Sequence, residues 1–394
     1  MARIVTSGKG RRWVLGGHPW IYADDITEKQ AQPGELVPVF GPNSEALGWG
    51  LHSSASRIAV RLVSRSEEQP NRAFWEDLVR RAVAHRERLG LLDPEGACRL
   101  LSGDAERLPG LVVDRYADVL VVQSGCQGSD RMRDFLLEVL LEALPFEVRA
   151  ILDRSDSGVR RLEELDTRVE WIKGAVDEPV LVREPSGMLY EVDVTAGHKT
   201  GHYLDQRDNR EVAAAYANGG TVLDAFSYDG LFGISAALRG ASDVLCIDQA
   251  AACEPRVRRN AELNGVADRV RFEKQNAMND LRRRAAEGET YDLVVVDPPA
   301  FARNKREAEG AARGYRELNL RAMHLVRPDG HLVSASCSYA VRREDFLGHL
   351  ADAARDSGRD AWLLHVAGAA HDHPVLLTLP ESSYLKCAFV RMGA

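Results

Sequence analysis

The chain has 394 residues, more than a single hydrophobic core usually organises, so we expect two or three domains. Its net charge of −8 excludes a protein that coats nucleic acid unspecifically through a basic surface, although a local basic patch stays compatible with it. No apolar run is long enough to cross a bilayer, and the N-terminus lacks the apolar core of a signal peptide. We therefore expect a cytoplasmic protein.

The first predicted domain, residues 1–68, contains short β-branched runs separated by Gly and Pro, a pattern typical of a small β-barrel. Basic residues dominate its start, before the first acidic residue at Asp24. We predict that Lys9, Arg11 and Arg12 contact substrate phosphates, with a solvated charged face as the alternative.

The second predicted domain, residues 69–183, mixes helices and strands. Apolar residues at helical spacing predict helices over 73–92 and 131–144. Runs rich in β-branched residues predict strands over 110–116, 119–124 and 149–155. This order indicates a small α+β domain.

In the third predicted domain, residues 184–394, strands alternate with helices after a first strand over 188–194 and a helix over 203–217. Such alternation predicts an α/β fold with a doubly wound, mostly parallel sheet, in which ligands bind beyond the carboxyl ends of the strands. The predicted strands cover 221–226, 243–248, 269–274, 291–297 and 331–336, and the helices that follow them cover 233–240, 254–265, 279–288, 315–326 and 345–358.

The first three of these strand ends carry polar residues with two readings each. The stretch LDAFSYDGLFG (223–233) is either a ligand-binding turn or an ordinary strand-to-helix turn. It lacks the GxGxxG of a dinucleotide site, which argues against a nicotinamide dehydrogenase. Asp248 either accepts hydrogen bonds from an adenosine ribose or caps the next helix. Asn276 either reads an adenine edge or starts a helix.

The stretch VVVDPPAF (294–301) is more specific, because Pro298 and Pro299 fix the backbone after a buried strand and hold Asp297 toward a ligand. Cys337 ends the last predicted strand between two serines and would face the same crevice. A buried structural thiol is the alternative for Cys337, and it is the expected role of Cys98, Cys126, Cys246, Cys253 and Cys387.

In this order the strand ends resemble the S-adenosylmethionine (SAM) dependent methyltransferase fold. With GHKTGHYLDQRDNR (197–210), GYRELNLRA (314–322), ASCS (335–338), HDHPVLL (371–377) and YLK (384–386), the chain resembles the RlmI/RlmO family of 23S rRNA cytosine-C5 methyltransferases. The stretch GRRWVLGGHPWIY (10–22) is similar to the opening of that family's PUA domain.

The resemblance implies SAM as cofactor and 23S rRNA as partner. It implies a cofactor site formed by Asp224, Phe226, Ser227, Tyr228, Gly230, Asp248, Asn276 and Asp297, with Gln206 and Arg207 at its border or in an ordinary surface role. Pro298, Pro299 and Phe301 are the expected substrate contacts in this domain.

Cytosine C5 is a poor nucleophile, so a thiolate must first add to C6. We predict that Cys337 does this, while Asp297 hydrogen-bonds the base near N3 and N4. A methyltransferase acting on a guanine or adenine nitrogen is the alternative, but it needs no thiol. A non-catalytic RNA-binding protein would need neither motif.

Two further expectations concern metals and assembly. His371 and His373 alternate along a stretch that is compatible with a strand, but no third ligand is evident, so no metal site is expected. A homodimer is the assembly we allow for.

Overall fold

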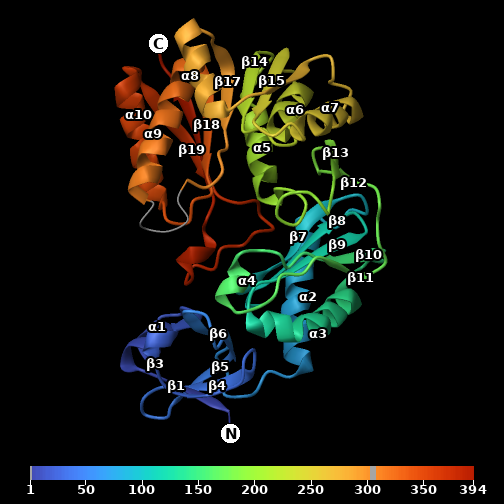
Figure 1. Cartoon of the computed structure of the whole chain (residues 1–394), viewed down its shortest axis with the longest axis vertical. Helices are drawn as coiled ribbons and strands as arrows, with labels where there is room; N and C mark the ends of the chain where they lie inside the picture. The colour runs from blue at the N-terminus through green and yellow to red at the C-terminus, as the bar shows by residue number, and fades with distance from the viewer. Residues whose placement is uncertain (1, 302–307) are drawn as a thin grey trace. The chain divides into compact units, whose positions relative to one another are not determined.

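The structure is a computed structural model that describes residues 2–301 and 308–394, and the chain divides into two compact units (Figure 1). Unit 1 contains Met1–Pro185, Val192–Leu204 and His371–Ser383, and unit 2 contains Ser186–Glu191, Asp205–Ala370 and Tyr384–Ala394. The domain boundaries predicted at residues 68 and 183 remain predictions.

The N-terminal part of unit 1 is a six-stranded sheet with the order β2-β6-β5-β4-β1-β3. Strands β1 and β4 are parallel, and the other neighbours are antiparallel. The buried side chains of this sheet form a small hydrophobic core. Helix α1 (Gly8–Leu15) begins after Ser7, whose side chain accepts a hydrogen bond from Gly10 N–H. The strands are β1 (Arg3–Thr6), β2 (Trp20–Tyr22), β3 (Ile26–Gln30), β4 (Leu36–Phe40), β5 (Ala46–His52) and β6 (Ile58–Ser64).

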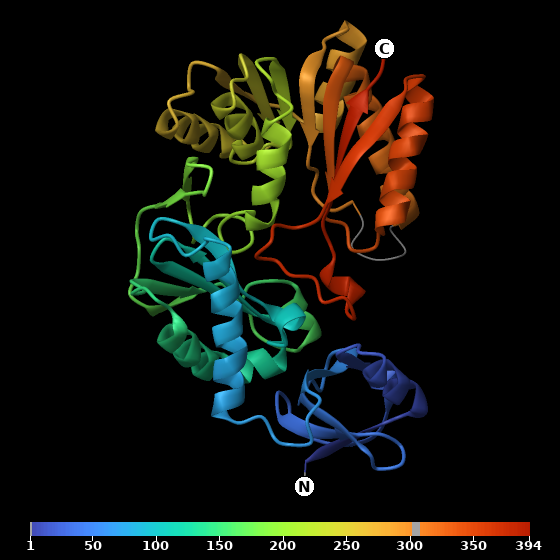
Figure 2. The ribbon, with the colours of Figure 1, turned by 180° about the vertical axis from the view of Figure 1, so that it is seen from behind.

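The second part of unit 1 has a five-stranded sheet, order β11-β10-β9-β8-β7, against which α2 (Arg72–Arg88) and α3 (Gln127–Ala143) pack (Figure 2). The predicted helices and the strands β8, β9 and β10 are confirmed, whereas β7 and β11 were not predicted. The strands are β7 (Ala97–Ser102), β8 (Leu111–Tyr116), β9 (Val119–Ser124), β10 (Ala150–Asp153) and β11 (Glu170–Lys173), and β12 (Val180–Arg183) follows.

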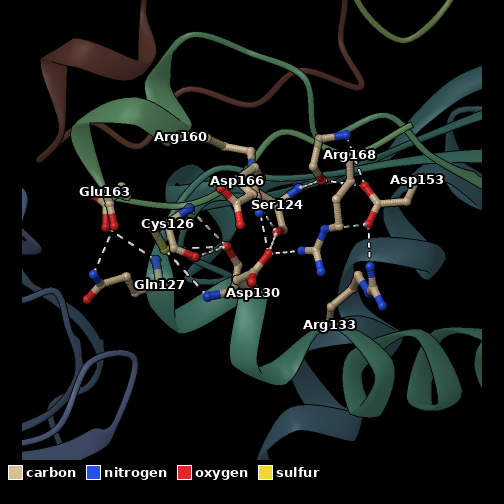
Figure 3. A network of polar contacts seen from close by, with 12 residues as sticks. Ser124, Cys126, Gln127, Asp130, Arg133, Asp153, Arg160, Glu163, Asp166 and Arg168 are labelled. Atoms are coloured by element: carbon tan, nitrogen blue, oxygen red, sulfur yellow. Dashed lines mark hydrogen bonds and ion pairs between the residues drawn. The ribbon is translucent and has the colours of Figure 1, made fainter. Parts of the chain in front are cut away.

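A network of buried charges fixes the segment around α4 (Val159–Leu162) to these elements (Figure 3). Arg160 Nη1 donates to Asp130 Oδ1 at 2.7 Å. Glu163, 1% exposed, accepts from Gln127 N–H at 3.2 Å and from Arg61 Nη2 at 3.0 Å. Because Arg61 belongs to β6 and Gln127 to α3, Glu163 joins the N-terminal sheet to α3.

Unit 2 contains a seven-stranded sheet with the order β16-β15-β14-β17-β18-β20-β19. The first five strands are parallel, and β20 is antiparallel to both of its neighbours. This confirms the predicted doubly wound, mostly parallel sheet. The strands are β14 (Thr221–Ala225), β15 (Asp243–Asp248), β16 (Val270–Lys274), β17 (Tyr291–Val296), β18 (Val326–Ser336), β19 (Ala361–Ala367) and β20 (Lys386–Met392); β13 (Leu189–Val192) precedes them.

Helices cover both faces of this sheet (Figures 1 and 2). Those on one face bury Leu281, Tyr315 and Phe346 against Val294 and Leu332 of the strands. The helices are α8 (Ala277–Glu287), α9 (Ala308–Leu325) and α10 (Arg343–Ser357) on this face, with α5 (Arg207–Ala214), α6 (Leu231–Leu238) and α7 (Cys253–Leu263) on the other.

Three features differ from the sequence predictions. Strand β18 begins at Val326 instead of residue 331, and β19 and β20 were not predicted. His371 and His373 lie in a turn, so the strand considered for them is wrong. In the part of the chain that the structure describes, no helix has the length and apolar character needed to span a membrane.

Candidate active site

Five neighbouring strands bring polar residues to one edge of the seven-stranded sheet. Asp248 ends β15, Asp224 lies next to the end of β14, Asp297 follows β17 and Cys337 follows β18. These four strands are parallel, so their carboxyl ends meet at the same edge. Lys386 joins them from the start of β20, since this antiparallel strand pairs Lys386 with Ser336.

The turn from β14 to α6 has an unusual backbone. Phe226 (φ 64°), Tyr228 (φ 50°) and Gly230 (φ 75°) all occupy the left-handed region, which costs free energy for the two aromatic residues. Ser227 between them is 9% exposed, and within the described residues its buried Oγ has no hydrogen-bond partner. A strained turn with an unsatisfied hydroxyl fits a binding site for a polar ligand.

Asp224 is buried beneath this turn, at 1% exposure. Gly233 N–H donates to its Oδ2 at 3.0 Å. Burial raises the pKa of Asp224 to about 7, and the negative charges of Asp297 and Asp248 add to the rise. Three carboxyl groups therefore gather at this edge of the sheet.

Asp248 is half-buried, and its carboxylate accepts from two backbone groups: Tyr228 N–H at 3.2 Å and Ala250 N–H at 3.0 Å. These bonds hold the carboxylate beside the strained turn. Both readings of Asp248 thus retain support, because it stabilises the start of the segment before α7 and also faces the predicted cofactor turn.

Asp297 is half-buried and accepts from Gln206 Nε2 at 3.0 Å. Asn209 in turn donates to Gln206 Oε1 at 2.6 Å, so η3 (Leu204–Gln206) and α5 orient the carboxylate. Gln206 therefore reaches the strand-end edge directly. Arg207, the next residue, is buried and pairs with Asp208 at 3.3 Å.

The prolines after Asp297 lead the chain away from the strand. Pro298 is buried and Pro299 exposed, and the half-buried Phe301 packs on Tyr315 with ring centroids 4.7 Å apart. Phe301 thus presents an aromatic surface close to the segment that carries Cys337. An aromatic ring at such a place can stack on a nucleobase.

Cys337 is half-buried, whereas the other five cysteines are buried. The serines on both sides of it bind one hydroxyl: Ser336 Oγ donates to Tyr315 Oη at 2.8 Å, and Ser338 Oγ lies 2.8 Å from the same atom. Val296 of β17 pairs with Ser334 of β18, so Asp297 and Cys337 leave adjacent strands. The two groups therefore follow adjacent strands at the same edge of the sheet.

The remaining predicted site residues lie elsewhere. Asn276 is exposed and caps α8 by accepting from Asn279 N–H at 3.2 Å, so its helix-start reading has structural support. In unit 1, Lys9 pairs with Asp25 at 3.2 Å, Arg11 pairs with Glu45, and Arg12 is exposed. Sequence reasoning assigned no role to Tyr315 or Lys386, although the motifs GYRELNLRA and YLK contain them.

Comparison with known proteins agrees with this fold. The family of S-adenosylmethionine-dependent methyltransferases matches residues 157–388, and the PUA-like domain family matches residues 4–65. The chain belongs to the S-adenosylmethionine-dependent methyltransferases, carries an N-terminal PUA-like domain and uses SAM as its cofactor.

Similar curated proteins cover nearly the whole chain. It is 38% identical to the Ribosomal RNA large subunit methyltransferase I of Shewanella amazonensis over 95% of both chains. It is also 38% identical to the protein of that name from Aeromonas hydrophila, over 99% of this chain and 100% of the other. The expected resemblance is thereby confirmed.

Solved structures support the fold. The structure of the methyltransferase SMU.776 complexed with SAH superposes with a TM-score of 0.86 at 19% identity, over 99% of this chain and 100% of that one. A SAM-dependent methyltransferase from Streptococcus mutans gives a TM-score of 0.84 at 18% identity, with the same coverage.

Proposed function

We propose that this protein transfers a methyl group from SAM to C5 of a cytosine in 23S rRNA, through a covalent bond between Cys337 and C6 of the base. The observation that carries this proposal is the pair of Asp297 and Cys337 on adjacent strand ends, at the same edge as the SAM turn. The names of the relatives support large-subunit rRNA as the substrate.

The cofactor supplies an electrophilic methyl group when bound. The turn from Phe226 to Gly230 would line its methionine end, where Ser227 Oγ offers an unsatisfied polar atom. The Asp248 carboxylate would accept hydrogen bonds from the ribose hydroxyls. The carboxylates of Asp248 and Asp297 at this edge suit a positively charged sulfonium.

The chain's own residues then act on the base. The thiolate of Cys337 forms a bond to C6, and the electrons of the C5–C6 double bond make C5 nucleophilic. Asp297 hydrogen-bonds the base near N3 and N4 and stabilises the protonated adduct. C5 would form its bond to the methyl carbon as the bond from that carbon to the sulfonium sulfur breaks, so the demethylated thioether leaves with the electron pair. A base then removes the C5 proton, and the C6–S bond breaks to restore the double bond and release the thiolate.

The reacting base must leave any stack to reach Cys337, because C6 is covered within a helix. An accessible or single-stranded rRNA element is therefore the proposed substrate. Phe301 would stack on the extruded base beside Pro298 and Pro299. Lys9, Arg11 and Arg12 of the PUA-like domain would bind phosphates elsewhere on the RNA.

RNA that contains 5-fluorocytosine tests the proposal, because its C5 has no proton to lose after methylation. We expect an enzyme–RNA adduct that survives denaturation and requires SAM. Cys337→Ala should abolish both the adduct and turnover while SAM affinity, measured by calorimetry, stays nearly unchanged.

Cys98→Ala, which removes a buried thiol of β7, is the matched control and should still form the adduct. A Cys337→Ala enzyme that methylated cytosine C5 at the normal rate would contradict the proposal.

A further inference from the structure

Lys386 occupies a position that the proposed reaction does not yet explain. It is 5% exposed at the start of β20, directly opposite Ser336 in the strand pairing. Its Nζ donates to the carbonyl oxygens of Ser338 at 2.8 Å and of Tyr384 at 2.9 Å. Among the described residues no carboxylate forms an ion pair with it, although a buried lysine is usually paired with one.

The two acceptors place this lysine beside the thiol. Ser338 directly follows Cys337, so Lys386 anchors the backbone on one side of the thiol. Tyr315, fully buried on α9, binds the hydroxyls of both flanking serines. Cys337 thus lies on a short segment that is hydrogen-bonded to Lys386 of β20 and to Tyr315 of α9.

Two opposite effects act on the charge of Lys386. Burial lowers the pKa of Lys386 to about 8, and a negative charge on the nearby Cys337 opposes this lowering. By linkage, the protonated lysine stabilises the thiolate to the same extent.

Other titratable groups face the same region. Tyr315 approaches from α9, and Tyr384 donates its hydroxyl to Asp205 at 2.7 Å. Asp297 lies at the end of β17, where its charge affects Cys387. These carboxylates would oppose a thiolate nearby, so a positive charge is needed to offset them.

We propose that Lys386 is a positioning residue that favours the thiolate form of Cys337 and fixes the backbone that carries it. The relevance of Lys386 to catalysis rests on the proposed function, in which a thiolate attacks C6. The role itself concerns the free enzyme and can be measured without RNA or SAM.

The test is the rate at which iodoacetamide alkylates Cys337 in the full-length protein, followed by mass spectrometry from about pH 6 to about pH 10. Cys337→Ala supplies the blank. Lys386→Met removes the charge at similar length and should raise the midpoint of the rate profile by about one pH unit, which lowers the rate near neutral pH about tenfold. Lys386→Arg keeps the charge and should stay near the wild-type midpoint.

The wild-type profile is a second measurement that needs no variant, and its midpoint should lie below the ordinary cysteine value of about 8.5. A wild-type midpoint at or above that value, or a folded Lys386→Met protein with the wild-type midpoint, overturns the inference. Its failure is distinct from that of the proposed function: the 5-fluorocytosine adduct reports on attack by Cys337, and the alkylation profile reports on Lys386.

Discussion

Asp224 brings a carboxyl group into the interior of the sheet, where Gly233 N–H donates to it but water is largely excluded. Its pKa of about 7 exceeds that of an unfolded aspartate, about 3.9. The folded protein therefore binds a proton more tightly than the unfolded chain. The contribution of Asp224 to the free energy of unfolding is fully present below about pH 4 and declines as the pH rises toward about 7.

We predict that Asp224→Asn removes this decline, because an amide can accept from Gly233 but cannot ionise. Between about pH 4 and pH 7 the free energy of unfolding should fall by up to about 4 kcal/mol more in the wild type than in the variant. Urea denaturation, monitored by a spectroscopic signal from unit 2, measures the difference in the free energy of unfolding between the two proteins. Parallel pH profiles for the two proteins would contradict the buried-carboxyl argument.

At the scale of elements, the alternation of strands and helices over residues 221–358 made the doubly wound sheet predictable, because the apolar runs of β14, β15, β17 and β18 form largely buried parallel strands. Strand β20 was missed, since it is buried along nearly its whole length and shows no alternation of buried and exposed residues. Strand β19 was missed too, because four consecutive residues of this edge strand are exposed.

The difference between the parallel strands and the antiparallel strand β20 also explains which site residues were predictable. Asp224, Asp248, Asp297 and Cys337 all lie at carboxyl ends of parallel strands, where the general rule looks for ligands. Lys386 begins an antiparallel strand, so the rule does not apply to it. Only its pairing with Ser336 in the folded sheet brings it to the edge where the parallel strands end.

The close packing of α6 on the sheet requires a glycine at position 233. A Cβ there would lie 2.7 Å from Val244 Cγ1 and 2.9 Å from Cys246 Sγ. We predict that Gly233→Ala lowers the free energy of unfolding by about 1–3 kcal/mol through overpacking, and that it weakens SAM binding by moving the turn before α6. Denaturation and calorimetry measure the two effects.

Gly348 is the matched control, since it lies on the exposed face of α10 and a Cβ there would meet nothing within 4 Å. Gly348→Ala should leave SAM binding unchanged and stabilise the helix by about 0.5–1 kcal/mol. Equal effects from the two substitutions would mean that helix propensity, and not packing against β15, decides the outcome.

Glu163 offers a comparable test in unit 1, where its carboxylate joins β6 to α3. Glu163→Gln would leave Arg61, which is 7% exposed, with less compensation for its buried charge. We predict a loss of about 3 kcal/mol or more in the free energy of unfolding. Glu164→Gln, at an exposed neighbouring position, should change stability by less than about 0.5 kcal/mol.

For the whole molecule, a net charge of −8 must be reconciled with the proposed RNA substrate. The chain should repel a polyanion at long range, so binding needs local basic surfaces. The start of the PUA-like domain offers one, but Lys9 and Arg11 already pair with Asp25 and Glu45. Phosphates must compete with these carboxylates, which favours specific contacts over general attraction.

We therefore predict that replacing Lys9, Arg11 and Arg12 together by Gln weakens RNA binding and flattens its salt dependence. Each phosphate contact to single-stranded RNA contributes about 0.7 to the slope of log K against log salt, so losing three contacts should reduce the slope by about 2. The matched control replaces three exposed, ion-paired arginines of α7, α8 and α9 by Gln, which removes the same charge: Arg258, Arg282 and Arg316. If phosphate contacts at the PUA-like domain carry the affinity, the control should keep the wild-type slope to within about 0.7, one contact. Equal losses in both triple variants would instead assign the effect to net charge and leave the N-terminal residues as a solvated face.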